Sequence, residues 1–409
     1  MNRFDVVVVG CGRAGSAIAD ALAATGRRVA AVKLDHDDHA DRVSLALDGL
    51  APPQPSPIRF ELLKGPAKFL SPKTLSVAGQ EVEARRFVLA AGGRPRIEPG
   101  LTDLNVLSSL TALTSPPPAS AVILGGGPVA AVIADRYSRA GGSVTILGRA
   151  MRFLPAEDES VADALAGRFR ARGIEIHAGV VDIVTRAQDQ GFSVSWPAGN
   201  DVRELKVESV VAATGLRANT DGLDLKSADV YVADDGHVVI DDELRTSNPC
   251  ISAVGHITSP GCSLAMQDHH AELVAQNFQS PFYARQKLEI TEPPRIVRTS
   301  PPIARVGASE SEARRLFRDV VTAVAPYFDG ANDASAAGVI KLVGRRRGGR
   351  LLGAHLVGAG APELVLFFDL LVRSEIPLAD VPERRHFPLP GPTDAAYRAL
   401  TAWVNAAYG

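Results

Sequence analysis

Residues 5–32 read DVVVVGCGRAGSAIADALAATGRRVAAV, and residues 120–147 read SAVILGGGPVAAVIADRYSRAGGSVTIL. Each stretch predicts a buried strand, a tight glycine turn, a helix and a second strand. Such a turn lets the backbone approach a pyrophosphate, which lies at the amides and the positive dipole end of the helix. Two turns in this context predict two dinucleotide-binding units, against the alternative of α/β turns that bind nothing. The turn residues are Gly10, Gly12, Gly15, Gly125, Gly127 and Ala130.

Composition and charge narrow the class of protein. A chain of 409 residues is too long for one core, and about two to four domains are expected. The net charge of −2 gives no electrostatic reason to expect nucleic acid or an anionic membrane as a partner. The basic run Arg345–Arg347 lies between two strand-like runs and predicts a solvated hairpin turn. Phe4–Val9 is too short for a signal peptide or a membrane span.

The cysteines indicate the redox compartment. Cys11, Cys250 and Cys262 are odd in number and scattered along the chain. This pattern excludes a disulfide framework and is typical of a reducing environment. We therefore expect a cytoplasmic protein.

The order of patterns divides the chain into four blocks: 1–116, 117–245, 246–290 and 291–409. The first two each contain one nucleotide unit, and the last is an α+β block, which is commonly an association domain. We expect strands at Arg28–Val32, Ile58–Leu63, Thr74–Val77, Ser143–Leu147, Phe192–Trp196, Leu205–Ala212, Ile303–Val306, Gly338–Leu342 and Leu351–Val357. We expect helices at Asp158–Arg172, Ser309–Leu316, Pro362–Ser374 and Thr393–Ala407.

Several segments of the chain resemble, in the same order, those of the FAD- and NAD(P)-dependent pyridine nucleotide–disulfide oxidoreductases. This family includes glutathione reductase, dihydrolipoamide dehydrogenase and mercuric reductase. GCGRAG resembles its FAD turn and GGGPVA its NAD(P) turn. The other resembling segments are AAGGRP (90–95, with Ala91 and Gly92), AATGLRANT (212–220, with Gly215), RTSNPCISAVGH (245–256, with Gly255), PPIARVGASESEAR (301–314), GVIKLV (338–343) and LLGAHLVGAGAPELV (351–365).

The resemblance implies an α/β fold of two Rossmann-like three-layer nucleotide-binding domains and a C-terminal α+β dimerisation domain. It makes 1–116 the first part of a shortened FAD-type domain, 117–245 the NAD(P)-type domain, 246–290 the return of the FAD-type domain and 291–409 the dimerisation domain. It further implies a homodimer.

Two departures concern thiol chemistry. The redox-active CxxxxC of the family has no counterpart, because the chain continues after Val32 with KLDHDDHADRVSLALDGLAPPQPSP, as if the helix were deleted. Disulfide exchange needs an attacking thiolate and a partner sulfur. The C-terminal His-Pro-Thr of the family is here Gly391-Pro392-Thr393. His386 and Asp394 are candidate acid/base residues, against the alternative that His386 is an ordinary loop histidine.

Other departures concern the flavin. The glutamate that usually accepts hydrogen bonds from the adenosine ribose is replaced by Lys33, which only donates, although Asp35 could substitute. The Gly-Asp of the second flavin motif is Gly255-His256, and Ala91 replaces a threonine. A neutral imidazole can still accept one hydrogen bond. We expect a loosely held FAD, with loss of the flavin as the alternative; His256 is a third candidate catalytic residue.

The second unit indicates its own cofactor. Gly148 stands where NAD-specific units place an acid, and Arg149 and Arg152 follow it. Without the carboxylate there is no repulsion of a 2′-phosphate, and a guanidinium can pair with that phosphate. This pattern favours NADP(H) over NAD(H), unless both arginines are simply solvated.

The run QDHH at 267–270 suggests a metal site at first sight. Adjacent residues of a helix diverge by about 100°, so His269 and His270 do not converge on one ion. We expect a polar pocket lining and no metal.

Taken together, these features predict an atypical flavoprotein that oxidises NADPH and passes electrons to a quinone, oxygen or a small metabolite. The alternative is a flavin-less, non-redox dimer that senses nucleotides or acts as a scaffold.

Overall fold

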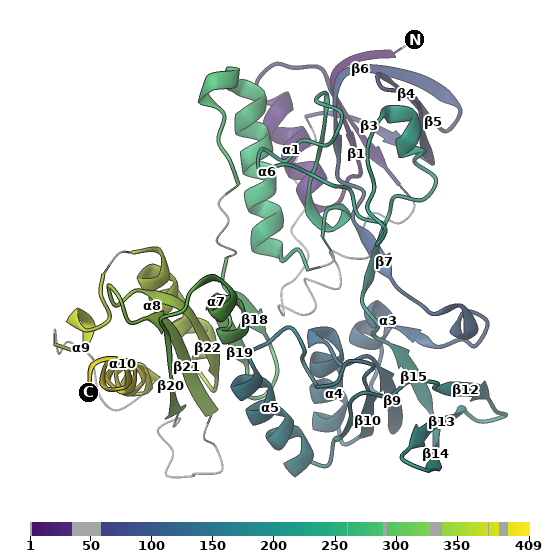
Figure 1. Ribbon diagram of the computed structural model, residues 1–409. Coiled ribbons are helices and arrows are strands. Elements are labelled where there is room, and N and C mark those ends of the chain that lie inside the picture. The colour runs from purple at the N-terminus through teal and green to yellow at the C-terminus, as the bar shows by residue number, and fades with distance from the viewer. Residues whose placement is uncertain are drawn as a thin grey trace. The chain divides into compact units, whose positions relative to one another are not determined.

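The computed structural model describes residues 2–34, 59–259, 261–288, 293–327, 338–374, 376–383 and 392–409 (Figure 1). The chain forms two compact units, each built from two separate stretches. Unit 1 comprises Met1–Arg96 and Gly215–Ile290, and unit 2 comprises Ile97–Thr214 and Thr291–Gly409. Candidate Asp35 and the segment in which the family has its redox-active helix lie outside the described residues, as do His386 and Gly391.

Unit 1 is organised around one sheet in the order β3-β2-β1-β6-β5-β4, with β17 paired to β6. The pairs of β1 with β2 and β6, of β2 with β3, and of β17 with β6 are parallel, so the carboxyl ends of these strands meet at one edge. The strands are β1 (Asn2–Val9), β2 (Val29–Lys33), β3 (Glu61–Lys64), β4 (Ala67–Ser71), β5 (Thr74–Val77), β6 (Gln80–Leu89) and β17 (Ile251–Ala253). A short antiparallel pair joins β7 (Gly93–Pro95) and β16 (Leu216–Ala218).

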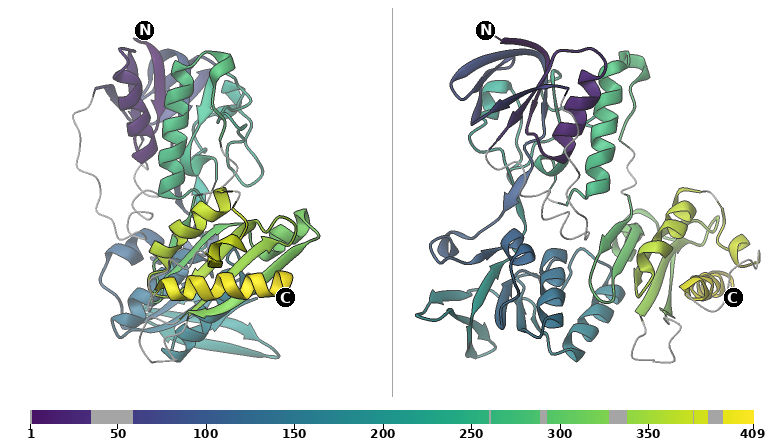
Figure 2. Two further views of the ribbon diagram at one scale, coloured as in Figure 1. Left: turned by 90° about the vertical axis from the view of Figure 1, so that its left-hand side faces the viewer. Right: turned by 180° about the vertical axis from the view of Figure 1, so that it is seen from behind.

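Two cores cover the two faces of this sheet. Helices α1 (Arg13–Ala23) and α6 (Leu264–Gln279) pack on one face, where alternate residues such as Val6, Val8 and Val88 are buried (Figure 2). The opposite face buries Phe69 and Phe87 together with the segment from Ala218 to Val238. The short helices of the unit are η2 (Leu225–Ala228), η3 (Gly255–Ile257) and η4 (Phe282–Ala284).

Unit 2 contains a parallel sheet in the order β11-β10-β9-β15-β8. A small antiparallel sheet, β12-β13-β14, packs on it through Val194, Trp196 and Val207. The elements are β8 (Leu107–Ser108), β9 (Ser120–Leu124), β10 (Ser143–Leu147), β11 (Glu175–His177), β12 (Val184–Ala187), β13 (Phe192–Ala198), β14 (Asp201–Val207), β15 (Ser209–Ala212), η1 (Pro99–Leu101), α3 (Ser109–Thr114), α4 (Pro128–Arg139) and α5 (Glu159–Ala171).

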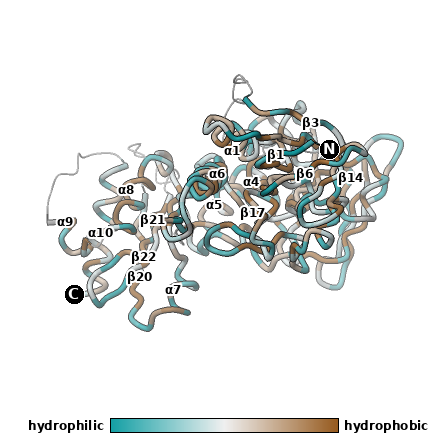
Figure 3. The backbone as a smooth tube through the Cα atoms, turned by 90° about the horizontal axis from the view of Figure 1, so that it is seen from above, coloured by the Kyte–Doolittle hydropathy of each residue, from teal (hydrophilic) through white to brown (hydrophobic). Residues whose placement is uncertain are grey.

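The C-terminal part of unit 2 is an antiparallel sheet, β18-β19-β22-β21-β20, with α8 and α10 packed against it. Figure 3 colours the backbone of the chain by the hydropathy of its residues. The elements are β18 (Arg295–Val297), β19 (Ile303–Gly307), β20 (Val320–Tyr327), β21 (Gly338–Arg345), β22 (Leu351–Val357), α7 (Glu310–Leu316), α8 (Ala361–Arg373), α9 (Asp380–Glu383) and α10 (Pro392–Tyr408). The predicted α/β class and C-terminal α+β block are confirmed.

Most predicted elements are confirmed within one or two residues, and one is wrong. The predicted strand Leu205–Ala212 is two strands in two sheets, β14 and β15, that meet at Glu208. The Glu208 backbone donates to the Ser120 hydroxyl and its carboxylate accepts from the Ala119 amide, so the chain changes sheets there. The predicted hairpin at Arg345–Arg347 is confirmed and surrounds Asp319.

Within unit 2, buried charges connect α5 to β21. The Lys341 ammonium lies 3.0 Å from the Asp158 carboxylate and 2.7 Å from the Glu310 carboxylate. The side chains of Lys341 and Asp158 are only 7% and 4% exposed. Asp158 is also the N-cap of α5, where it accepts from the Ser160 amide. Because Lys341 and Asp158 are buried, water cannot replace these contacts, and removing one charge leaves another buried charge without its partner.

We predict that Lys341→Met lowers the free energy of unfolding by about 3–5 kcal/mol, because Asp158 becomes a buried carboxylate without its cation. The measurement is chemical denaturation followed by circular dichroism. Lys206→Met is the matched control, since Lys206 is an exposed strand lysine and its replacement should change stability by about 0.5 kcal/mol or less. Equal losses for the two variants would contradict the prediction.

Candidate functional site

The first glycine turn has the geometry of a pyrophosphate cradle. Gly10 follows β1 with φ +112°, and a Cβ atom there would lie 2.2 Å from the Ala90 carbonyl oxygen at the end of β6. A Cβ at Gly15 would lie 2.2 Å from the Gly10 carbonyl oxygen. Gly12 is the N-cap of α1, and no side chain caps the helix. The first-turn amides of α1 are therefore open to an anion, which fits the pyrophosphate of FAD.

Two further segments reach the same edge of the sheet. Ala91 and Gly92 follow β6, and Gly255 and His256 follow β17. Asn219 holds the first segment: its side-chain amide donates to the Ala91 carbonyl at 2.8 Å and its backbone amide to the Gly92 carbonyl at 3.1 Å. The predicted flavin residues of the three segments are thus brought together in unit 1. The role of Asn219 is not visible in the sequence, because it is 128 residues from Ala91.

Gly215 occupies a different place in unit 1. It has φ +107°, and its carbonyl accepts from the Arg96 amide. It directly precedes β16, which pairs with β7 after Gly92. Gly215 therefore supports the segment that contains Ala91 and Gly92, and its contact with a cofactor stays a prediction.

His256 and His270 are buried, neutral histidines. Each is 4% exposed, and burial lowers the pKa of each to about 4, with smaller contributions from His237 and His269 respectively. The Gly255 amide donates to Nδ1 of His270 at 3.2 Å. The side-chain amide of Gln267 contacts Nδ1 of His256 at 3.3 Å. His256 is therefore a neutral ring held by Gln267 at the position where the family has an aspartate.

The QDHH segment at 267–270 makes polar contacts with the start of α1, next to the first glycine turn. Asp268 receives two hydrogen bonds from Arg13, at 2.8 and 2.7 Å, which tie the first turns of α6 and α1 together. His269 is exposed whereas His270 is buried, so the two rings diverge as predicted. In the described parts of the chain no cluster of three metal-ligating side chains occurs. Arg13 was missed by the sequence analysis, since its partner is 255 residues away.

At the end of β2, Lys33 is exposed and stands in register with Lys64 of β3. The carbonyl of Lys33 accepts from the Gly65 amide, so the strand continues to this residue. The side chain has donors only. A hydrogen-bond acceptor for the adenosine ribose is therefore missing at the position where the resemblance places one.

The second glycine turn repeats the first. Gly125 follows β9 with φ +128°, and a Cβ there would lie 2.2 Å from the Ala213 carbonyl oxygen, next to the end of β15. Gly127 is the N-cap of α4 without a side-chain cap, Pro128 begins the helix, and Ala130 is fully buried. This turn also leaves helix amides open to a pyrophosphate.

The two arginines after β10 have partners already. Arg149 pairs with Glu98 at 2.9 Å while its side chain stays 62% exposed. Arg152 donates to the backbone carbonyls of Pro155 and Glu157 at 3.0 and 2.6 Å. The exposed Arg149 is thus the one better placed to reach a 2′-phosphate, and its reading of that phosphate stays a prediction.

The remaining residues are Asp394 and the three cysteines. Asp394 is in the first turn of α10 and forms an ion pair with Arg398 of the same helix. Cys11 is half-buried in the first turn, Cys250 half-buried before β17 and Cys262 buried before α6, and none is in a disulfide. No described helix is long and apolar enough to cross a bilayer.

Comparison with curated proteins finds relatives of related activities. The chain is 28% identical over 329 residues to a mercuric reductase from Staphylococcus aureus, covering 79% of this chain and 60% of that protein. It is 29% identical to a glutathione reductase from Burkholderia cepacia, covering 78% of this chain and 71% of the relative. It is 29% identical to a dihydrolipoyl dehydrogenase from Bacillus subtilis, covering 85% and 77%. The chain therefore spans less than two thirds of the mercuric reductase.

Solved structures agree on the fold. The HOCl-induced flavoprotein disulfide reductase RclA from Escherichia coli superposes with a TM-score of 0.81 at 22% identity, covering 98% of this chain and 99% of that chain. The dimerisation domain of the pyridine nucleotide-disulphide oxidoreductases matches residues 293–391. The model of the family's nucleotide-binding part matches residues 4–276, and the chain therefore belongs to the pyridine nucleotide-disulphide oxidoreductase family.

Proposed function

We propose that this chain is an atypical NAD(P)H-dependent flavoprotein oxidoreductase that passes electrons to a non-disulfide acceptor such as a quinone, oxygen or a small metabolite. One observation carries the proposal. Both glycine turns keep the geometry that admits a pyrophosphate, while the sequence has no CxxxxC. FAD, when bound, supplies the acceptor for a hydride from nicotinamide, a step that needs no cysteine.

The chain's own residues would bind and orient the cofactor. The open amides of α1 hold its pyrophosphate, and the segment Ala91–Gly92, fixed by Asn219, lines the same edge. His270 holds the Gly255 amide, and Gln267 holds the His256 ring. These contacts position His256 as a neutral ring, because its pKa of about 4 keeps it uncharged at pH 7.

The cysteines argue against the activity of the relatives named disulfide reductases. Cys250 and Cys262 are 12 positions apart in the sequence, and Cys11 lies in the glycine turn. Reducing a disulfide requires one thiolate to attack and a second to resolve the mixed disulfide. The spacing supplies no such pair. Gly391 likewise has no proton to exchange where the family has histidine.

A flavin-less, non-redox nucleotide sensor or scaffold is the second candidate. Lys33 favours it, because an ammonium at the end of β2 cannot accept from the ribose hydroxyls. The absorbance spectrum of the purified protein separates the two candidates, since bound oxidised flavin is yellow. For either candidate we propose a cytoplasmic homodimer formed through the C-terminal domain, which matches the family's dimerisation domain.

We predict that dithiol chemistry is absent. The full-length protein is assayed with NADPH against glutathione disulfide, lipoamide and Hg(II), and separately against a quinone and oxygen. No turnover with the first three is expected, because no thiol pair is available. Turnover of them at about 1–1,000 per second, typical of enzymes, would sink the proposal.

We predict that Arg149 contributes to NADPH binding. Arg149→Glu should weaken NADPH binding by about 1.5–3 kcal/mol, roughly tenfold or more, and leave NADH binding similar or improved. Arg203→Gln, an exposed arginine on β14, is the control and should change neither affinity. The measurement is calorimetric titration. Equal affinity of the unmodified protein for NADPH and NADH would refute the preference for NADP(H).

We predict that FAD is weakly held and that Lys33 is one cause. Lys33→Glu restores an acceptor and should raise the flavin released per chain on denaturation, and His256→Asp should act in the same direction at the second flavin motif. The two effects should be about additive if the sites are independent. Lys64→Glu on the adjacent strand β3 is the control.

Two outcomes would contradict this prediction. Full occupancy in the parent protein after dialysis would show that other contacts hold the flavin firmly. Equal gains from Lys64→Glu and Lys33→Glu would show that the effect is one of net charge. If no variant retains flavin after incubation with excess FAD, the non-redox candidate becomes the better one.

A further inference from the structure

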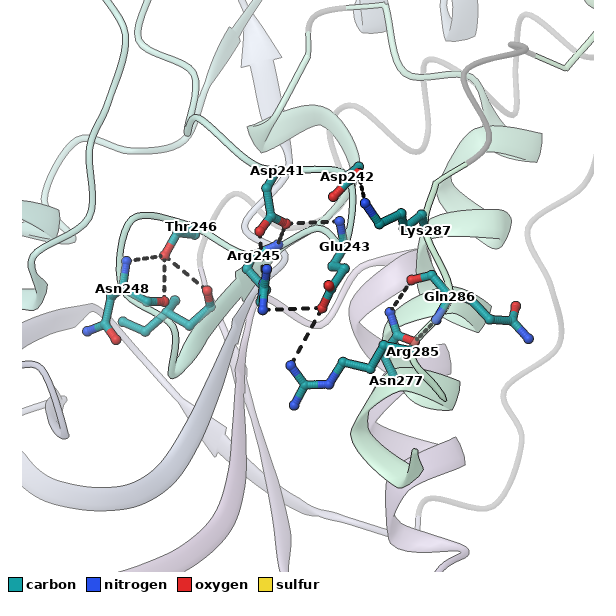
Figure 4. Close-up of polar contacts among 11 residues, drawn as sticks. Asp241, Asp242, Glu243, Arg245, Thr246, Asn248, Asn277, Arg285, Gln286 and Lys287 are labelled. Carbon is teal, nitrogen blue, oxygen red and sulfur yellow. Dashed lines mark hydrogen bonds and ion pairs between the residues drawn. The ribbon is translucent and has the colours of Figure 1, made fainter. Parts of the chain in front are cut away.

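Unit 1 contains a small, partly open pocket on the helix-covered face of its sheet. Its volume for water is about 20 Å³, enough for an ordered water or one oxygen of a ligand. It is lined by three arginines, Arg86, Arg245 and Arg285, by Glu243, and by Cys250 and Ser252 next to α6. Figure 4 shows Arg245 and Arg285 directed at Glu243, with Asn277 of α6 beside them.

Strand register explains why these side chains meet. β17 pairs with β6 so that Ile251 is level with Phe87 and Ser252 with Val88. Phe87 and Ile251 belong to the core on the far face. Because side chains alternate along a strand, Arg86, Cys250 and Ser252 point to the opposite face, toward α6. The pocket therefore lies between these strands and α6, and connecting segments add Glu243, Arg245 and Arg285 to its lining.

The acidic groups of this pocket pair with two of its three arginines. The Glu243 carboxylate, 11% exposed, lies 3.3 Å from Arg245 and 3.5 Å from Arg285. Arg245 is also committed to Asp241 at 2.8 Å. Arg86 has no ion pair or side-chain hydrogen bond within the described chain and lies 4.9 Å from the centre of the Phe278 ring. Burial, together with the neighbouring Arg285, lowers the pKa of Arg86. Of the three guanidiniums, Arg86 is thus the one without an acidic partner among the described residues.

A second group in the pocket lacks a partner. The Ser252 side chain is 7% exposed, and its hydroxyl makes no hydrogen bond to any described residue. The hydroxyl oxygen itself is not cut off from solvent, so a water or a ligand in the pocket can reach it. Arg86 and Ser252 both line this pocket, so a guanidinium and a neutral hydroxyl donor lie at the same small space. This donor set is the complement of an oxyanion.

We propose that this pocket binds one small oxyanion of the phosphate type, held by the Arg86 guanidinium and the Ser252 hydroxyl. Glu243 weakens the binding, because its carboxylate occupies Arg245 and Arg285 and repels an anion. The site is separate from the glycine turn: Ser252 precedes Gly255 by three residues, roughly 10 Å along the strand direction. Free phosphate and the phosphate group of a metabolite share this chemistry.

The test is calorimetric titration of the full-length protein with inorganic phosphate and with a small phosphomonoester, at constant ionic strength. Arg86→Gln should weaken binding at this site about tenfold or more. Arg85→Gln is the matched control: it makes the same change one residue earlier, where the side chain is 86% exposed, and Arg85 does not line the pocket. Phosphate held at either glycine turn is common to all variants, so the difference isolates this pocket.

Glu243→Gln should tighten phosphate binding, because it removes a negative charge from the pocket. A variant that only disturbed the fold would weaken binding instead. Ser252→Ala should weaken it, and this smaller change serves if Arg86→Gln fails to fold. Tighter binding of the phosphomonoester than of phosphate would identify a phosphorylated metabolite as the occupant, and equal binding would identify the free anion. The proposal is overturned if phosphate gives no binding beyond the glycine turns, or if Arg85→Gln and Arg86→Gln have equal effects.

Discussion

The architecture of both nucleotide units depends on one close contact, made twice. In each unit the first glycine of the turn lies against the carbonyl oxygen that follows the neighbouring parallel strand: Gly10 against Ala90, and Gly125 against Ala213. A methyl group at either position would come within 2.2 Å of that oxygen. The contact lets the strand, its neighbour and the next helix meet at one edge, and so leaves the amides at the start of α1 and α4 facing that edge.

Around the first of these contacts, polar residues of α6 fix the surrounding backbone. Asp268 holds Arg13 of α1, and His270 holds the Gly255 amide. The replacement of a family aspartate by His256 therefore does more than remove a charge, because the imidazole is itself held by Gln267. A buried ring with a pKa of about 4 adds no charge at neutral pH, so His256 lacks the negative charge of the aspartate that it replaces.

Much of the fold could be predicted from the sequence, because its strong signals are local. Apolar runs bounded by glycine located Ser143–Leu147 and Leu351–Val357 to the residue. Leu205–Ala212 was wrong because its apolar residues continue across the change of sheet at Glu208. In the site, the turn glycines were predictable, whereas Arg13–Asp268, Asn219–Ala91 and Glu98–Arg149 were not. These pairs join residues 51 to 255 positions apart, and no local pattern reports such contacts.

The glycines and the polar residues carry different kinds of information about function. Packing of β1 against β6 requires Gly10 whether or not a nucleotide binds. The glycine turn by itself is therefore evidence for the fold and not for a bound nucleotide. The chemistry is decided by the polar side chains at the strand ends. At the end of β2, Lys33 stands where the family has a hydrogen-bond acceptor for the adenosine ribose, and the sequence has no CxxxxC. The first turns of α1 and α4, however, have no side-chain cap. The proposed binding of two nucleotides therefore rests on these two helix starts, and hydride transfer from a nicotinamide to a flavin requires no cysteine.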